Sequence, residues 1–225
     1  ALKKGSHLEA ENLLRQIVSS GTNNYFVYGS LAVLSGKKGN INEMFEHLTH
    51  SIKLNPNYAE GYFNLGVIYL KKGDFDNAVH SFLNTIRIRP EDSNALNMLG
   101  VAFFKKGNIK SSINYYSKAI ELNPQNDNIY NNLAIAYSNS GNLEAAVSIY
   151  LKALKIDSNS FSTLFNLGRI YQQKGDLEKA LETFEKILKL KNVNSLDLVF
   201  NEIGITLQKK EDFHSAIKAY LKAIK

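Results

Sequence analysis

The chain of 225 residues has no cysteine, no tryptophan and only three prolines. Without cysteine, disulfide bonds and thiolate metal sites are excluded, and the composition is compatible with a reducing compartment. No apolar run approaches the roughly 18 residues that a membrane-spanning helix needs. The residues before the first amphipathic segment do not read as a signal peptide, and we expect none. We therefore expect a cytoplasmic protein without a membrane-inserted segment.

Arginine is also scarce, although the net charge is +6. The only arginines are Arg15, Arg87, Arg89 and Arg169, and lysine supplies the other positive charges. Phosphate and base recognition favours the planar fork of arginine, so this balance does not favour nucleic acid as the partner. It favours acidic protein partners instead.

Residue patterns that would form a catalytic or metal centre are missing as well. Among the histidines only His47 and His50 are close in sequence, and two ligands are fewer than the three or four of a zinc site. No glycine-rich phosphate loop follows a strand, and no serine has a recognisable base and orienting partner. We therefore predict no metal site, no cofactor and no enzymatic activity.

What the chain does have is a repeat of 34 residues. Glycines at this interval are Gly5, Gly39, Gly73, Gly107, Gly141 and Gly175, and the prolines Pro56, Pro90 and Pro124 keep the same spacing. A fixed period of this length indicates one supersecondary unit stacked many times.

The stretch 59–92 shows why each unit is a pair of helices. Its apolar residues fall on one helical face twice, first from Tyr62 to Tyr69 and then from Ala78 to Ile86. Between the two runs, Gly73 suits a left-handed helix stop and Asp74 suits the cap of the next helix. Proline then ends the second helix. The short connection predicts antiparallel neighbours, whose backbones approach at small residues.

This pattern resembles the tetratricopeptide repeat, whose signature recurs in one register over nearly the whole chain. Over residues 59–92 it reads Tyr62, Leu65, Gly66, Tyr69, Gly73, Ala78, Phe82, Thr85 and Pro90. The resemblance implies an all-α, right-handed superhelical solenoid of antiparallel helix pairs. It also implies that the first helix of each unit lines the concave face.

We predict a single solenoid over residues 1–225, with five full repeats and a truncated repeat at each end. The full repeats are 25–58, 59–92, 93–126, 127–160 and 161–194, flanked by a partial repeat, 1–24, and an incomplete one, 197–225. In the first segment Ala10, Leu14 and Ile17 are expected to be buried. A two-residue insertion between Lys191 and Leu196 predicts a longer loop. Because the chain starts without methionine inside a unit, we expect a piece of a longer protein.

Function is expected in the concave groove, at the second, fifth, ninth, twelfth and thirteenth positions of each repeat. The predicted peptide-binding residues are Phe63, Val67, Leu70, Lys71, Asn97, Val101, Phe104, Lys105, Asn131 and Ile135. Repeat 161–194 places Ser162, Phe165, Arg169, Gln172 and Gln173 at the same positions. An exposed apolar strip beside asparagines and lysines suits a peptide with apolar anchors and some acidic residues. Alternatively, these residues only pack on neighbouring repeats.

We therefore predict a non-catalytic scaffold for protein or peptide partners. The lysine and asparagine clamp with which chaperone-binding members of the family grip a C-terminal carboxylate is absent. A column formed by Asn64, Asn132 and Asn166 resembles the asparagine ladder of protein O-linked sugar transferases. It leaves open a substrate-recognition arm of a larger enzyme. Self-assembly through the uncapped apolar C-terminal end is a third possibility.

Overall fold

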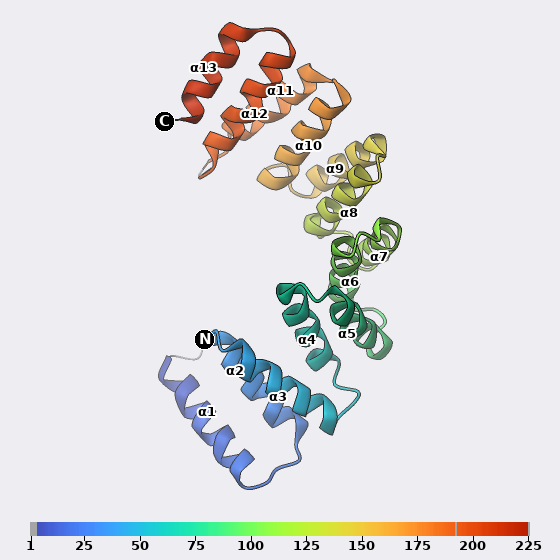
Figure 1. The fold of residues 1–225 in the computed structure, drawn as a ribbon, viewed down its shortest axis with the longest axis vertical. Coiled ribbons are helices and arrows are strands. Elements are labelled where there is room, and N and C mark those ends of the chain that lie inside the picture. The colour runs from blue at the N-terminus through green and yellow to red at the C-terminus, as the bar shows by residue number, and fades with distance from the viewer. Residues whose placement is uncertain (1–3, 192, 225) are drawn as a thin grey trace. The chain divides into compact units, whose positions relative to one another are not determined.

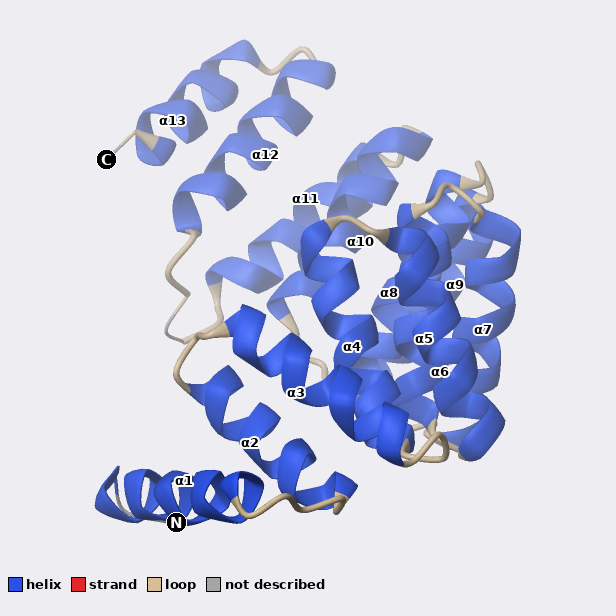
Figure 2. Ribbon diagram, turned by 60° about the horizontal axis from the view of Figure 1, so that its bottom comes forward, coloured by secondary structure: helices blue, strands red, loops and turns tan. Residues whose placement is uncertain are grey.

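The computed structural model describes residues 4–191 and 193–224, where every regular element is an α-helix and no strand occurs (Figure 2). The chain divides into two compact units, Ala1–Asn108 and Ile109–Lys225. The first unit contains α1 (Lys4–Ser19), α2 (Tyr25–Lys37), α3 (Ile41–Leu54), α4 (Ala59–Lys72), α5 (Phe75–Ile88) and α6 (Ser93–Lys105) (Figure 1). The second contains α7 (Ile109–Leu122), α8 (Asp127–Asn139), α9 (Leu143–Ile156), α10 (Phe161–Lys174), α11 (Leu177–Leu188), α12 (Leu196–Lys209) and α13 (Phe213–Ala223).

The predicted helix ends are confirmed in repeat 59–92. Gly73 closes α4 in the left-handed conformation, with φ of 77°. The Asp74 carboxylate then accepts a hydrogen bond of 3.2 Å from the backbone N–H of Asn77 and so caps α5. The second helix ends at Ile88, two residues before Pro90. The same chemistry that interrupts the apolar periodicity therefore sets the length of each helix.

Each helix packs on its neighbours in the chain within its unit, for example α4 on α5 and α5 on α6. The helices of one pair approach at the small residues that the sequence singled out. Gly66 lies under the buried ring of Phe82, where an added Cβ would come within 2.7 Å of the ring. Gly168 lies in the same way under Phe184. A residue without a side chain in the first helix thus makes room for an aromatic ring from the second.

The residues expected to be buried in the N-terminal helix are not the ones that the structure buries. In α1 the side chain of Ile17 is 43% exposed, and Ala10 and Leu14 are only half-buried. The buried residue is Glu11, whose carboxylate pairs with Lys38 and accepts a hydrogen bond of 2.9 Å from Nη2 of Arg15. These two partners lower the pKa of Glu11. The ion pairs decide which face of α1 is turned toward α2, against the apolar pattern.

The longer loop after α11 is confirmed. The links between consecutive full repeats have four residues, as in 89–92 and 157–160, whereas α11 and α12 are joined by 189–195. Within this loop Asn192 lies outside the described residues. Helix α11 is also shorter than the second helices of the four preceding repeats, with 12 residues instead of the 14 of α9. The insertion therefore lengthens the loop without adding a turn of helix.

One turn uses a residue that the backbone geometry disfavours. Glu211 occupies the place of the repeat glycine and has φ of 64°, the only positive φ of a residue other than glycine among those described. The left-handed region costs such a residue about 1–2 kcal/mol. Glycine in the same place would avoid this cost. Part of the gain in stability would be lost, because glycine has more conformational freedom in the unfolded chain.

We expect Glu211→Gly to stabilise the protein by about 0.5–1 kcal/mol. The melting temperature, followed by circular dichroism, should rise by roughly 1–4 °C. The control is Glu185→Gly, which places glycine at an exposed interior position of α11 and should lower the melting temperature. If both variants lower it, Glu211 is not strained.

Candidate functional site

In the first unit the predicted groove residues lie on two first helices that contact each other, α4 and α6. Helix α4 carries Phe63, Val67, Leu70 and Lys71. Helix α6 carries Asn97, Val101, Phe104 and Lys105. Both lysines are exposed, and the apolar residues and Asn97 are half-buried. The structure thus gathers these residues on neighbouring helices, with part of each apolar side chain already covered.

Phe63 shows what covers these side chains. Its ring meets the buried ring of Phe82 edge-on, with centroids 5.7 Å apart and planes at 68°. Phe165 makes the same contact with Phe184, at 6.0 Å and 61°. A phenylalanine at the fifth repeat position therefore belongs in part to the core between the two helices. The free side of Phe63 lines a small cavity of about 270 Å³ with Glu60 and Arg89.

In the second unit a larger pocket of about 530 Å³ opens over the first helices α8, α10 and α12. The ninth-position residues of three consecutive repeats, Ile135, Arg169 and Ile205, all line it. Most of the other lining residues also lie on these three helices, and they are Ser138, Asn139, Asn166, Ile170, Gln172, Gln173, Glu202 and Lys209, with Tyr150 from α9. One predicted site residue, Ile135, is thus brought together with residues that were not chosen.

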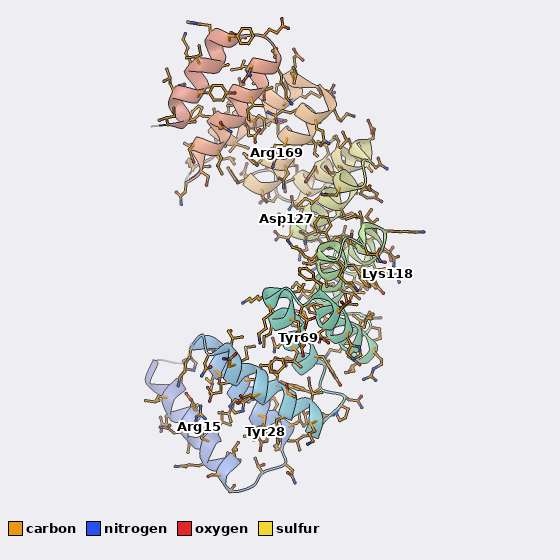
Figure 3. All side chains as sticks on the ribbon, viewed as in Figure 1. Arg15, Tyr28, Tyr69, Lys118, Asp127 and Arg169 are labelled. Atoms are coloured by element: carbon orange, nitrogen blue, oxygen red, sulfur yellow. The ribbon has the colours of Figure 1, made fainter. Side chains whose placement is uncertain are left out.

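Arg169 supplies an exposed positive charge to this pocket. The residue lies on α10 (Figure 3). Its side chain is 60% exposed, and its Nε lies 3.6 Å from Oε1 of Glu202 on α12. Lys209 adds a second positive charge, and it is exposed. The pocket therefore combines two cations with one carboxylate, and a net positive site favours an acidic group on a ligand.

Two amides tie the first helices of this unit together. Gln172, predicted as a groove residue, is only 7% exposed, and its Nε2 donates hydrogen bonds of 2.9 Å to the Glu202 carbonyl and 2.6 Å to Oγ1 of Thr206. Gln172 was expected to be exposed, and that expectation is wrong because both of its hydrogen-bond acceptors lie on the next repeat. The Nδ2 atom of Asn166 donates to Oδ1 of Asn131 at 3.2 Å. Asn131, a predicted ligand contact, and Asn166 of the asparagine column thus bond to each other.

Arg169 and Gln173 were identified from the sequence as groove positions. They were not included among the predicted peptide-binding residues, because those were selected mainly for exposed apolar side chains. Glu202 was missed as a functional residue, although it interrupts the asparagine column. A usable signal was present, since positions twelve and thirteen of repeats 127–160 and 161–194, and position nine of the latter, carry polar side chains beside Ile135. Within residues 4–191 and 193–224 no three histidine, aspartate or glutamate side chains converge as metal ligands.

Family models match four stretches of the chain. Models described as tetratricopeptide repeat match residues 47–80, 125–192 and 199–225, and one described as TPR repeat matches 100–141. Together they cover more than half of the chain. The chain belongs to the tetratricopeptide repeat family.

Solved structures of tetratricopeptide repeat proteins have the same fold. The C-terminal part of a TPR repeat-containing protein from Cytophaga hutchinsonii aligns with a TM-score of 0.78 at 19% identity, over 97% of this chain and 93% of that one. YrrB, described as a TPR protein with an unusual peptide-binding site, gives 0.67 at 20% identity, over 92% and 96%. MamA gives 0.66 at 23% identity, over 74% and 90%. Identities this low establish the fold alone. No curated protein matches the chain significantly.

Membership in the family fixes the class of function. The chain is an all-α tetratricopeptide repeat solenoid and a protein-interaction scaffold, and proteins of this family are generally non-catalytic. In the described part of the chain, no helix has the length and apolar character that crossing a membrane requires.

Proposed function

We propose that this tetratricopeptide repeat protein binds an extended or helical peptide segment of a partner protein along the concave positions of its first helices. The observation that carries the proposal is the pocket over α8, α10 and α12, where one position from each of three repeats faces the same space. A volume of about 530 Å³ accommodates several side chains of a peptide.

The charge of the pocket indicates the ligand. Arg169 and Lys209 outnumber Glu202, so an acidic side chain can displace Glu202 from Arg169 and keep the guanidinium paired. The Ile135 and Ile205 side chains supply apolar contacts beside it. The ligand that fits is a segment in which an acidic residue is flanked by aliphatic ones.

The half-buried residues of α4 and α6 supply a second set of contacts in the first unit. Val67, Val101 and Phe104 offer apolar surface, and Lys71 and Lys105 offer exposed positive charge. This set also favours apolar anchors with acidic neighbours. Phe63 contributes less free surface, since its ring is engaged by Phe82.

A peptide array screened with the wild-type protein and with Arg169→Ala tests the proposal. The affinity of acidic peptides should fall by roughly fivefold to tenfold, because a charge-assisted hydrogen bond worth about 1–1.5 kcal/mol is lost. Lys152→Ala, at an exposed position of α9 outside the pocket, is the control. Val67→Ser tests the first unit in the same screen.

The melting temperature of each variant decides how a loss of binding is interpreted. Arg169 is exposed, so Arg169→Ala should melt with the wild type. Peptides that bind the wild type, Arg169→Ala and Val67→Ser equally well would show that the concave positions are not the binding surface.

A further inference from the structure

Two neighbouring loops of the second unit line a cavity of about 580 Å³ that shares no residue with the pocket over α8, α10 and α12. Asn159 and Phe161, where the link 157–160 joins α10, form one side of it. The other six lining residues all belong to the longer loop 189–195. The insertion that shifts the repeat pattern therefore builds most of the cavity wall.

The early end of α11 frees the residues that form this wall. Helix α9 runs to Ile156, whereas the equivalent residue after α11, Leu190, lies outside the helix. The backbone N–H of Leu190 donates a hydrogen bond of 3.0 Å to the carbonyl of Ile187, three residues back, which closes the helix with a tighter turn. The chain then reaches α12 as a loop whose side chains face the cavity.

The cavity offers apolar surface on both sides. Phe161, Leu190 and Val193 pack against the core between α10, α11 and α12, and each of them is only half-buried. Part of each side chain therefore remains accessible at the cavity. Apolar side chains that converge on one cavity favour an apolar group of a ligand.

The charges that line the cavity are positive. Lys189 and Lys191 both contribute to the wall, and both are exposed. The described lining residues include no aspartate or glutamate. An acidic group next to the apolar group of a ligand would therefore be attracted to the cavity.

Three carboxylates of the adjoining segments do not line the cavity. The Asp157 carboxylate accepts a hydrogen bond of 2.9 Å from the backbone N–H of Asn159, which holds it in the turn of the link. Asp127 accepts a hydrogen bond of 3.5 Å from Oγ of Ser160. Asp197 is exposed in the first turn of α12, where a negative charge suits the helix end. The two lysines therefore set the sign of the charge inside the cavity.

A stripe of side chains on α10 connects the cavity with the pocket of the proposed function. The ring of Phe161 stacks on that of Phe165, with centroids 5.6 Å apart and planes at 15°. Arg169, which lines the pocket, follows Phe165 by four residues. This spacing places all three on one face of the helix, so a ligand that follows the face reaches both places.

The length of the stripe sets the distance between the two places. Phe161 and Arg169 are eight residues apart on α10, which corresponds to about 12 Å along the helix axis. An extended peptide advances about 3.3 Å per residue. About three to four residues of a peptide therefore span the distance.

We propose that the cavity is a second anchor site for the peptide held at Arg169, and that it takes an apolar side chain with an acidic neighbour. The inference rests on the proposed function, because the peptide has to lie along α10. The apolar side chain contacts the three apolar residues of the wall, and its acidic neighbour meets Lys189 and Lys191. The preferred ligand carries this apolar residue about three to four residues from the acidic residue at Arg169.

The probes are fluorescein-labelled peptides of serine and glycine that carry one isoleucine–aspartate pair as the first anchor. A second series adds a leucine–glutamate pair, with the leucine one to seven residues from the aspartate and in both orders along the peptide. Fluorescence anisotropy measures the affinity for the whole chain. We expect the second pair to raise the affinity by roughly fivefold to tenfold at a separation of three or four residues, and by about twofold or less at one or seven.

Lys189→Glu tests the charge of the cavity. It should remove most of the gain in affinity from the second pair, because like charges then meet, and should leave the affinity of the single-anchor peptides unchanged. Lys155→Glu is the matched control, since Lys155 has the same repeat position, is exposed at the end of α9 and lines neither the cavity nor the pocket. Both lysines are exposed, so the two variants should melt at the same temperature.

Asn159→Trp tests the volume of the cavity. The indole at this exposed position fills the cavity from the side of the link and should also remove the gain from the second pair. Gln125→Trp places the same side chain at the equivalent exposed position of the preceding link, outside the cavity, and should leave the gain unchanged.

The single-anchor peptides separate this inference from the proposed function. If they bind the wild type and lose affinity for Arg169→Ala, but the second pair adds nothing at any separation, the second anchor site does not exist and the proposed function stands. Equal losses of the gain with Lys189→Glu and Lys155→Glu would also overturn the inference alone. If neither series binds the wild type, both proposals are wrong.

Discussion

Ala146→Glu should cost about 3–5 kcal/mol of stability, because it places an unpaired carboxylate in the core. Ala146 is fully buried and lies in one cluster with Ala134 of α8 and the ring of Tyr150. The methyl group fills the space where α8 and α9 touch, so a glutamate side chain at this position would be forced into apolar surroundings. The midpoint of thermal unfolding should fall by roughly 10 °C.

Ser148→Glu provides the matched comparison. It adds the same charge to the same helix at an exposed position and should change stability by less than about 0.5 kcal/mol. Melting temperatures of the two variants, followed by circular dichroism, separate the effect of burying the carboxylate from the effect of adding a negative charge to α9. Equal melting temperatures for Ala146→Glu and the wild type would mean that α8 and α9 do not pack as the structure shows.

Gly168→Val is expected to destabilise the second unit by about 2–3 kcal/mol. An added Cβ on Gly168 would lie 2.5 Å from Cε1 of Phe184, and that ring is fully buried, so it has no free space into which to turn. Valine is a better helix former than glycine, which offsets about 0.5 kcal/mol of the overpacking.

The size of the facing ring tests this cause. Phe184→Leu in the Gly168→Val background should recover part of the loss, although Phe184→Leu alone is destabilising, because the two substitutions share one contact. Gln173→Val, at an exposed position of α10, controls for the helix propensity of valine. Additive effects in denaturant unfolding would show that Gly168 and Phe184 do not compete for the same space.

The helix pairs could be predicted because their signals are local. A left-handed glycine, a capping aspartate or asparagine and an apolar stripe act within one or two turns, and they recur at an interval of 34 residues. The loop after α11 could be placed in the same way, from the shift of the repeat pattern at Asp197. Repetition turns weak single signals into a consistent register.

The candidate site was less predictable, because side-chain exposure depends on what the neighbouring repeat supplies. Gln172 and Arg169 lie three residues apart on one helix, yet one is buried by Thr206 and Glu202 and the other is largely exposed. Glu11 is buried in place of Ile17 because its charged partners come from α1 itself and from Lys38. Hydropathy carries no information about such partners.

The sequence by itself determined the family and the helix pairs, since both follow from short-range chemistry repeated in register, and it proposed positions on the first helices as candidates for the groove. Only the tertiary structure decided which of those positions stay open. It coupled Phe63 to Phe82, tied Gln172 to Thr206 and left Arg169 exposed, because burial is settled by whichever side chains the adjacent helix brings within contact distance.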